Sequence, residues 1–513
     1  MTTVYVDPQR GNDTTGNGSI TSPFATRTKG RQATGAGAHS VLVKRGSVET
    51  LSATFQATSC NGTGPSTPFR FGVYGDVADG PAIIRAPSNI TDLMFVLGGA
   101  QYIEVSDWDF DGQGFNQTPI NIQSNTADVI GITFRRCRAY NTTVRNGMTA
   151  DGKVAGYKIT DLLFEDCEAF NNAAHGFFAV GDVDVTYRRC RAMFNGATAT
   201  NGGHGFSSIA YRNQVTAASW VLQSGTTYRV STGGVTPLKV IINGHGTYPV
   251  LANAGATATP SAGQWGYTGG FLYINTNDAA TSYTGTYSYT VSPTILYEQC
   301  EAFNNIAFAG APYHEGHGFA ADDFTSYARF IGCISRDNEG NGISLNSGDY
   351  NTITGLVAYR NDLPAIQSWR GTGHRIINNT LIDNNTSAYA DSEVRLSGMS
   401  TSAIVSNNII RADGGSQSTV GLEFDSTSTS GTAANNNITG ASTRSSGVTE
   451  SGALSSDPAP YLTDSYRLVY SVSSPFVSGG TYLPAVTLRN GRCRPGATPV
   501  GAYAALLPRS ARV

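Results

Sequence analysis

The sequence predicts an all-β fold, a parallel β-helix (solenoid) with a small inserted β domain. The main observation is a phrase that combines alternating apolar residues, a Cys and an Asn-rich corner. It recurs as ITFRRCRAYNTT from Ile132, LLFEDCEAFNN from Leu162, VTYRRCRAMFN from Val185, ILYEQCEAFNN from Ile295 and ARFIGCISRDN from Ala328. The cysteines at 137, 167 and 190 lie 30 and 23 residues apart, and no helical pattern accompanies them. Short strands and polar corners repeating at this period are typical of a β-solenoid.

The composition fits many short strands joined by tight turns. The 513 residues include 60 Gly, and only 14% are charged. The net charge of −3 favours neither nucleic acid nor an anionic membrane as a partner. We see no apolar stretch that could span a membrane and no secretory signal, so we expect no membrane insertion. Five cysteines share one phase of the repeat and should stack inward as small apolar side chains: Cys137, Cys167, Cys190, Cys300 and Cys333.

Residues 1–90 are expected to form an N-terminal cap and the first coils. The chain opens with a strand and a Gly- and Asn-rich loop, and turn residues separate the next apolar runs. β-Helix coils should then fill 91–213, where the segment 102–114 alternates strictly between apolar and polar residues.

The repeated phrase disappears between 214 and 293 and resumes at Ile295. The simplest explanation is a β-rich domain inserted at one corner of the solenoid. It holds Trp220 and Trp265, which could form either a sugar platform or the core of the insertion. Coils continue over 294–445, and 446–513 forms a closing segment rich in Pro, Ser and Gly. Paired asparagines at the corners are expected to be structural.

Aligning the Gly-led strands by their first inward residue predicts which side chains share a column. The inward column reads Met148, Phe177, Phe206, Phe319, Ile343, Ile366, Val394 and Leu422. The nearer outward column reads Thr149, Phe178, Ser207, Ala320, Ser344, Gln367, Arg395 and Glu423. The farther outward column reads Asp151, Val180, Ile209, Asp322, Asn346, Trp369, Ser397 and Asp425.

This outward face mixes carboxylates, amides, arginines and a tryptophan, a combination that suits sugar. It predicts substrate-binding roles for His314, His317, Asn346, Trp369, Arg370, Arg395, Glu423 and Asp425. The densest acidic cluster is AGAPYHEGHGFAADDF, at 309–324. Glycosidic hydrolysis needs two carboxyl groups, about 5–5.5 Å apart for retention or about 6.5–9.5 Å for inversion. We therefore expect Asp322 to be catalytic, with Asp323 or Glu315 as its partner.

The chain resembles right-handed parallel β-helix proteins of the pectate-lyase-like superfamily. The likeness lies in the opening YVDPQRGND…GNGS…SPFAT, in the coils and in the tail YRLVYSVSSPFVSGGT…RPG…VGAY. The resemblance implies a right-handed helix. The superfamily includes phage tailspike depolymerases, polysaccharide lyases and glycoside hydrolases. The element GHGFSSI at 203–209 is similar to one in polygalacturonases, but it precedes the paired aspartates here, whereas it follows them in that family. No polygalacturonase residue is therefore carried over.

The expected function is hydrolysis of an extracellular or capsular polysaccharide without a cofactor. The first alternative is β-elimination on a uronic-acid polymer, with Arg395 or Arg370 and His317, or Lys153 beside Asp151, as the base and with calcium as a cofactor. The second is a non-enzymatic glycan-binding adhesin. The resemblance also implies a homotrimer, and the missing signal favours a virion tail over a secreted protein.

Overall fold

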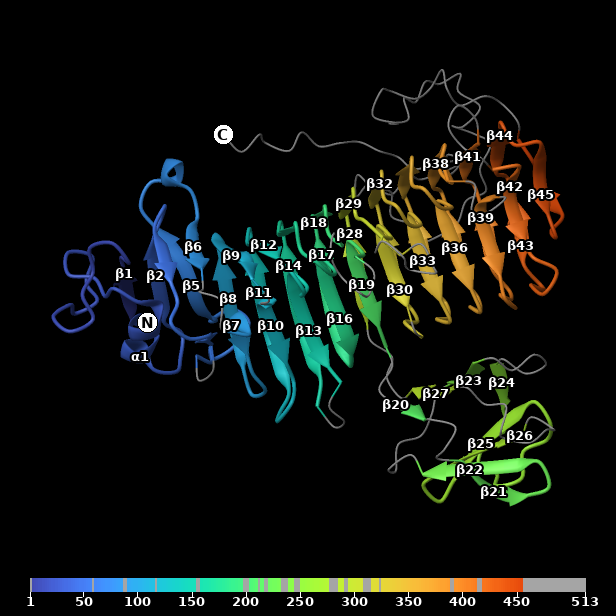
Figure 1. The fold of residues 1–513 in the computed structure, drawn as a ribbon, viewed down its shortest axis with the longest axis horizontal. Helices are drawn as coiled ribbons and strands as arrows, with labels where there is room; N and C mark the ends of the chain where they lie inside the picture. Colours follow the sequence, from blue (N-terminus) through green and yellow to red (C-terminus); the bar gives the residue numbers. More distant parts are fainter. Residues whose placement is uncertain are drawn as a thin grey trace.

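The computed structural model describes residues 2–454 except 58–59, 86–89, 116–117, 154–156, 197–202, 211–212, 216–219, 232–238, 244–249, 276–284, 290–293, 308–314, 323, 388–391 and 413–417. Over these residues the chain winds into a parallel β-helix whose coils each add one strand to three long sheets (Figure 1). A smaller mixed sheet projects from its side. The predicted all-β fold with an inserted β domain is confirmed.

The three long sheets are named sheet I, sheet II and sheet III, in the order in which each coil visits them. Sheet I contains β1 (Thr3–Val6), β2 (Ser40–Lys44), β5 (Phe69–Tyr74), β8 (Gln101–Ser106), β11 (Val129–Arg135), β14 (Ile159–Glu165), β17 (Val183–Arg188), β28 (Ile295–Glu298), β31 (Arg329–Ile331), β34 (Thr352–Thr354), β37 (Arg375–Ile377), β40 (Ile404–Ser406), β43 (Thr432–Ala434) and β46 (Glu450–Ser451). Sheet II contains β3 (Val48–Thr50), β6 (Ala82–Arg85), β9 (Trp108–Phe115), β12 (Arg138–Thr142), β15 (Glu168–Phe170), β18 (Arg191–Met193), β29 (Glu301–Phe303), β32 (Ile334–Arg336), β35 (Val357–Tyr359), β38 (Thr380–Ile382), β41 (Ile409–Arg411) and β44 (Asn437–Thr439). Sheet III contains β4 (Phe55–Gln56), β7 (Asp92–Val96), β10 (Thr118–Gln123), β13 (Met148–Gly152), β16 (Phe177–Gly181), β19 (Phe206–Ile209), β30 (Phe319–Asp322), β33 (Ile343–Asn346), β36 (Ile366–Trp369), β39 (Ser392–Ser397), β42 (Val420–Phe424) and β45 (Thr443–Ser446).

The interior of the solenoid is built from columns of equivalent side chains. The five predicted cysteines are free and fully buried, and each Sγ–H donates to a backbone carbonyl of the preceding coil, as Cys190 does to Phe164 O at 3.2 Å. Burial raises the pKa of the Cys137 and Cys190 thiols well above the ordinary value, which suits inert core groups. Beside them the rings of Phe177, Phe206 and Phe319 stack at 4.8 and 4.9 Å.

Asparagines form a buried ladder at the corner between sheets II and III. Asn171 and Asn304 adopt φ of 54° and 52°, a left-handed conformation that Asn tolerates, and the next residue in each pair joins the ladder. Each ladder side chain donates from Nδ2 to Oδ1 of the next, as Asn305 does to Asn338 at 2.8 Å. The ladder runs through Asn172, Asn195, Asn305, Asn338, Asn361 and Asn384. It ends where Asn384 donates to the buried carboxylate of Glu393, and the structural role expected for the corner asparagines is confirmed.

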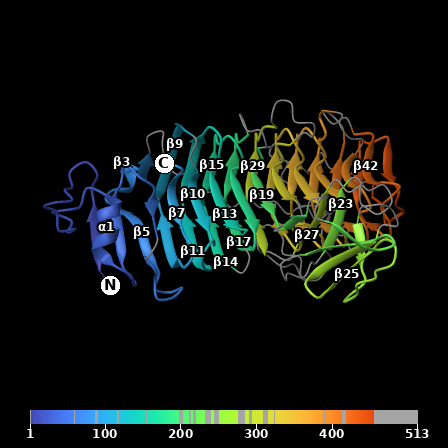
Figure 2. The same ribbon diagram turned by 60° about the horizontal axis from the view of Figure 1, so that its bottom comes forward.

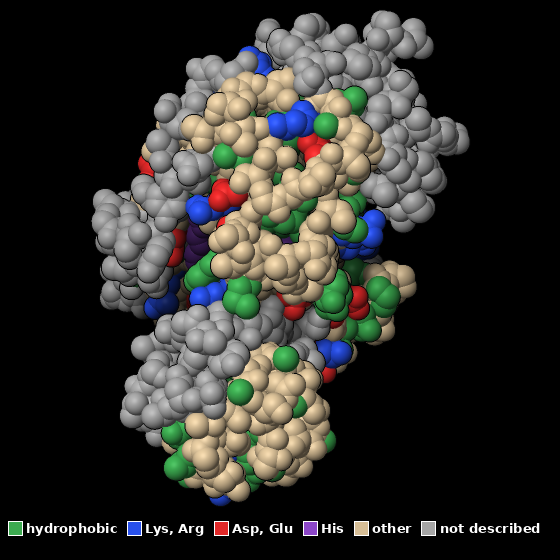
Figure 3. All heavy atoms as spheres, turned by 90° about the vertical axis from the view of Figure 1, so that its right-hand side faces the viewer, with side chains coloured by type: hydrophobic (Ala, Val, Ile, Leu, Met, Phe, Trp, Pro, Cys, Tyr) green, Lys and Arg blue, Asp and Glu red, His purple; other side chains and the backbone are tan. Residues whose placement is uncertain are grey.

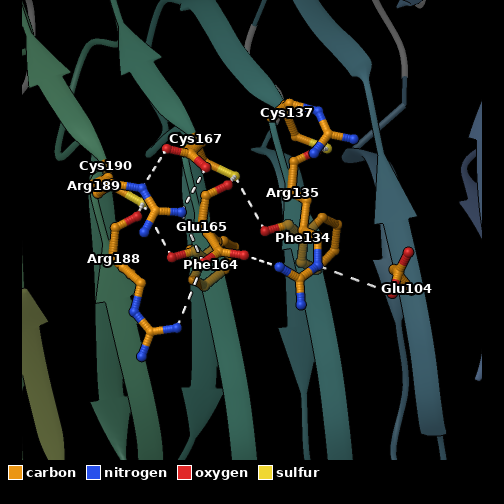
Figure 4. A network of polar contacts seen from close by, with 12 residues as sticks. Glu104, Phe134, Arg135, Cys137, Phe164, Glu165, Cys167, Arg188, Arg189 and Cys190 are labelled. Atoms are coloured by element: carbon orange, nitrogen blue, oxygen red, sulfur yellow. Dashed lines mark hydrogen bonds and ion pairs between the residues drawn. The ribbon is translucent and has the colours of Figure 1, made fainter. Parts of the chain in front are cut away.

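The residues around the stacked cysteines alternate in charge from one coil to the next. RRCR at 135–138 faces EDCE at 165–168, which faces RRCR at 188–191. Glu165 lies among three cations: it pairs with Arg135, with Arg189 at 2.9 Å and with Arg188 at 3.5 Å (Figure 4). Opposite charges on neighbouring strands stabilise the native register, and a slip by one coil would place like charges together.

An Arg–Glu pair lies near each end of the described solenoid, buried at the N-terminal end and partly buried at the other. Arg27 begins α1 (Arg27–Thr34), which covers the first coils, and its Nη1 contacts Glu49 Oε2 at 2.5 Å with no exposed side-chain surface. At the other end Arg444 contacts Glu450 at 2.8 Å and donates to backbone carbonyls of the last coil. The short helix η1 (Val77–Asp79) and α1 are the two helices of the described residues. None of these helices is long and apolar enough to cross a membrane.

The inserted sheet leaves the solenoid after β19 without disturbing its coils. Its strands run in the order β20 (Asn213–Val215), β27 (Gly285–Tyr289), β23 (Lys239–Asn243), β24 (Val250–Asn253), β25 (Gln264–Thr268), β26 (Phe271–Asn275), β22 (Thr227–Ser231) and β21 (Val221–Ser224). The coils before and after it pair directly, with Val185 opposite Ile295 and Phe206 opposite Phe319. The inserted sheet lies beside the C-terminal half of the solenoid, near the carboxyl ends of the sheet III strands (Figures 1 and 2).

Candidate functional site

The registers predicted for sheet III are those found in the structure. Met148, Phe177, Phe206 and Phe319 pair in turn, and the same column continues to Leu422. In the farther outward column Ile209 pairs with Asp322, and Asn346 pairs with Trp369. Neighbouring strands lie about 4.8 Å apart, so Asp322, Asn346 and Trp369 end three successive strands at one edge of the sheet. That edge faces the inserted sheet (Figure 1).

Asp322 is the described carboxylate that best fits a reactive position. It ends β30, and 19% of its side chain is exposed, so the carboxylate is held by neighbours yet reachable. His204 Nε2 lies 3.6 Å from its Oδ2. Its backbone carbonyl accepts hydrogen bonds from Thr325, at 2.9 Å from the hydroxyl and 3.1 Å from the amide, which fixes the turn after the strand.

His204 belongs to a stack of three histidines, one from each of three successive coils. Its ring lies 4.9 Å from that of His175 and 4.7 Å from that of His317. Each Nδ1 accepts a backbone N–H of the following coil: His204 N–H donates to His175, His317 N–H to His204, and Asn341 N–H to His317. An imidazole that accepts at Nδ1 carries its proton on Nε2, so His204 directs an N–H at Asp322.

Burial keeps these histidines neutral. Desolvation lowers the pKa of His175 to about 4 and that of His317 to about 3, from an ordinary 6.5. It lowers the pKa of His204 well below the ordinary value, and the two flanking rings add to that shift. At neutral pH the stack therefore places a neutral N–H 3.6 Å from Asp322, an approach longer than a hydrogen bond. The contact with Asp322 is made by His204, and the substrate-binding role predicted for His317 of the same column stays a prediction.

Trp369 and Arg370 form a second feature two strands away from Asp322. Trp369 is 41% exposed, and the Arg370 guanidinium lies 4.0 Å from the centroid of its ring. Gly398 of the next coil lies against the edge of the indole, where a Cβ would come within 2.1 Å of Trp369 Cδ1. Desolvation lowers the pKa of Arg370. An exposed indole beside a guanidinium suits a sugar ring with an acidic substituent.

Three other predicted site residues make contacts within the chain. Arg395 Nε lies 3.4 Å from Glu423 Oε2, and Glu423 also accepts from the Ser392 hydroxyl at 2.8 Å. Asp425 accepts hydrogen bonds from the Gly398 amide and from Thr427 and Ser428. Burial alone would raise the pKa of Asp425, but these hydrogen bonds lower it below the ordinary value. Asp425 thus shapes a turn.

The predicted carboxylate partners of Asp322 stay predictions. Glu315 lies at the corner before β30, the strand that Asp322 ends. Asp323 and His314 fall outside the described residues, as does 455–513 of the predicted closing segment.

The residues considered for a calcium-dependent site are also engaged. Lys153 pairs with Asp151 at 3.3 Å. In the opening loop Asp7 accepts backbone N–H groups of Gln9 and Arg10, and Asp13 accepts those of Ala25 and Thr26. Across the described residues no group of three or more His, Cys, Asp or Glu side chains is arranged to hold a metal ion. These donors do not fit a calcium ion, because their oxygens already accept hydrogen bonds from the turn.

The tryptophans of the insertion form its own core. Trp220 is 8% exposed and Trp265 is 2% exposed, and both pack with Val230, Leu272 and Ile274. Of the two alternatives for these residues, the structure supports the core. Acidic, basic and apolar side chains are visible where the inserted sheet meets the solenoid, seen along its axis (Figure 3).

Comparisons with known proteins match the fold. No protein-family model and no curated protein sequence matches the chain. Among solved structures, the A-module of the mannuronan C-5 epimerase AlgE6 of Azotobacter vinelandii is 14% identical, with a TM-score of 0.43, and the match covers 82% of this chain and 91% of that one. Pectate lyase Pel9A is 13% identical, with a TM-score of 0.39 and coverage of 98% and 96%. Tailspike protein 3 of bacteriophage CBA120 is 10% identical, with a TM-score of 0.44 and coverage of 87% and 61%.

Proposed function

We propose that this protein is a depolymerase that hydrolyses glycosidic bonds of an extracellular polysaccharide, with Asp322 as a catalytic carboxylate. The observation that carries the proposal is the Asp322–His204 contact on the column that also holds Asn346 and Trp369. The carboxylate has the neutral Nε2–H of His204 on one side and keeps 19% of its side-chain surface exposed to a substrate. A sugar chain lying along the solenoid axis would meet the carboxylate, the amide and the indole in turn.

In this proposal Asp322 activates water or attacks the sugar, and a second carboxyl group protonates the leaving oxygen. Asp323, adjacent in sequence, and Glu315, on the preceding corner, remain the candidates for that acid. The separation between the two carboxyl groups decides whether the product retains or inverts its configuration. An extracellular or virion location belongs to the same proposal, because the polymer lies outside cells.

The test is a panel of capsular polysaccharides, exopolysaccharides, alginate and pectate, assayed for new reducing ends and for the ultraviolet absorbance of unsaturated uronates. Hydrolysis predicts reducing ends without absorbance. Asp322→Asn should lower turnover about 1000-fold, within the range of general acid–base catalysis, with an unchanged melting temperature. Full activity in that variant would remove Asp322 from the mechanism.

One observation favours β-elimination as the second candidate. Arg370 lies on the candidate face with its guanidinium 4.0 Å from the centroid of the exposed Trp369 ring, and desolvation lowers its pKa, the direction that a base needs. Arg395 and Lys153 are paired with carboxylates, and His317 Nδ1 already accepts a backbone N–H. Rising ultraviolet absorbance that disappears in Arg370→Gln but persists in Asp322→Asn would establish elimination in place of hydrolysis.

A further inference from the structure

Two tyrosines stand out at the corner between sheets III and I. Tyr327 and Tyr350 are 55% and 50% exposed, and their rings stack at 5.4 Å with an angle of 16° between planes. They follow β30 and β33, the strands that end in Asp322 and Asn346. The exposed pair therefore continues the candidate site around the corner of the solenoid.

These tyrosines occupy a backbone position that disfavours large side chains. Their φ angles are 59° and 55°, in the left-handed region, and the next two coils place Gly373 and Ser402 at the same position. The Tyr350 ring lies over Gly373. A Cβ atom at position 373 would come within 2.5 Å of Cδ1 of that ring, so the glycine makes room for it. A left-handed residue recurs in other coils, as at Tyr102 and Asn171, so the stacked and exposed rings are what distinguishes this corner.

Two exposed arginines lie beside the tyrosines on sheet I. Arg329 and Arg375 both pair with Thr352, one from each side, so they are two strands apart, or about 9.6 Å. Within the described residues neither arginine has an acidic side chain at ion-pair distance, in contrast to the arginines around the stacked cysteines. The carboxylate of Asp349 on the same corner accepts the backbone N–H of Thr372.

We infer that Tyr327, Tyr350, Arg329 and Arg375 form a binding strip for an acidic polysaccharide, one that carries carboxylate groups on its sugars. The inference rests on the proposed function and specifies its substrate class. Each guanidinium would hold a sugar carboxylate by paired charge-assisted hydrogen bonds, and the spacing of two strands places the two charges on different sugars of one chain. The tyrosine rings and hydroxyls, two residues before Arg329 and Thr352 on the same coils, offer apolar contact and hydrogen bonds to the sugars.

Binding is measured in the Asp322→Asn background of the full chain, so that cleavage does not interfere. Affinity electrophoresis through gels that contain alginate, polygalacturonate or neutral dextran provides the dissociation constants. We expect retardation by an acidic polymer, no retardation by dextran, and weakening of at least about tenfold in Arg329→Gln/Arg375→Gln. Tyr327→Asn/Tyr350→Asn, which suits the left-handed backbone but removes the rings, should weaken binding similarly.

Arg10→Gln is the matched control, because Arg10 is an exposed arginine of the N-terminal loop, far from the strip in the sequence. Equal affinity in Arg329→Gln/Arg375→Gln and the parent, or equal binding of dextran, would overturn the inference. These outcomes are independent of turnover. Retained binding with no cleavage by the unmodified protein would refute the proposed function alone, whereas cleavage of a neutral polymer would refute the strip alone.

Discussion

Asp322 Oδ2 lies 3.6 Å from Nε2 of His204, a residue 118 positions earlier in the chain and one coil away in space. The backbone N–H of His317 occupies Nδ1 of the same imidazole at 3.2 Å, which leaves the proton on the side that faces the carboxylate. The stacked coils thereby set the tautomer of a side chain beside the candidate catalytic group.

His204→Phe should lower kcat about tenfold with little change in KM, because the ring stack remains but the N–H that faces Asp322 at 3.6 Å is lost. The variant also leaves the His317 amide without its acceptor, which lowers stability by about 1 kcal/mol. His175→Phe likewise removes the acceptor of a backbone amide, that of His204, but leaves the imidazole beside Asp322 in place. Its loss of stability should therefore equal that of His204→Phe, and its kcat should stay unchanged. Steady-state kinetics and thermal unfolding of both variants test this; equal kcat would exclude a positioning role.

Acidification should destabilise the protein through the histidine stack. The pKa values of His175 and His317 fall from 6.5 in the unfolded chain to about 4 and about 3 in the fold. The unfolded chain therefore binds more protons below pH 6.5, and the stability is present above that pH and lost as the pH falls towards 4 and 3. Denaturation midpoints at several pH values measure the loss. His175→Asn accepts the same backbone N–H without titrating, and its midpoint should fall less; an identical fall would contradict this origin.

Glu165→Gln should lower the free energy of unfolding by about 2 kcal/mol, because it removes a charge held among Arg135, Arg188 and Arg189 with 11% of its side chain exposed. Glu298→Gln is the control on the same column, since Glu298 is 35% exposed and pairs with Arg188. Its cost should stay below about 1 kcal/mol. Urea unfolding compares the two, and equal costs would show that burial within the charge ladder adds nothing.

Asn305→Asp should cost about 3 kcal/mol at neutral pH. The Asn305 Nδ2 donates to Ala192 O and to Asn338 Oδ1, so a carboxylate there would face two acceptors in a buried site. Protonation restores one donor, and the penalty should shrink on acidification relative to the unmodified protein. Asn304→Asp, at the left-handed neighbour, should change stability by less than about 0.5 kcal/mol. Comparable losses at both positions, measured by thermal unfolding, would contradict the ladder's role.

Trp369→Ala should raise KM for the polymer roughly five- to tenfold while kcat stays nearly constant, because an exposed indole two strands from Asp322 binds sugar without taking part in bond cleavage. Phe194→Ala is the matched control, since Phe194 is 44% exposed at a different corner. Kinetics of the two variants on one polymer separate the roles. A large fall in kcat for Trp369→Ala would instead place the indole at the reacting bond.

The repeating architecture and the columns of sheet III were predictable from sequence, because strand alternation and Gly-led starts align equivalent residues without knowledge of distance. The alternating RRCR and EDCE phrases also carry a signal for the charge ladders, because they place opposite charges on neighbouring strands. The turn around Asp425 had a local signal as well, in the Ser and Thr residues that follow it.

The contacts of the candidate site were harder to predict. Whether His204 or His317 reaches Asp322 depends on how far a ring extends across neighbouring coils, which the alternation of inward and outward residues does not report. The distance between Glu315 and Asp322 depends on the path of a corner, which closeness in sequence does not determine. The short helix α1 was missed because its eight residues include polar and Gly residues and show no apolar stripe.

The insertion has a consequence for the order in which this rod assembles. Arg188 and Glu298 are 110 residues apart in the chain yet adjacent in the solenoid. The coils before and after the insertion can therefore pair only when the chain between them closes into a loop. Chain entropy grows slowly with loop length, and bridging the insertion costs only about 1 kcal/mol more than closing an ordinary coil. Because the inserted sheet has its own core, it can fold independently, while the coils on each side of it pair with their own neighbours. A different inserted domain can therefore take its place beside Asp322 during evolution without a change in how the solenoid folds.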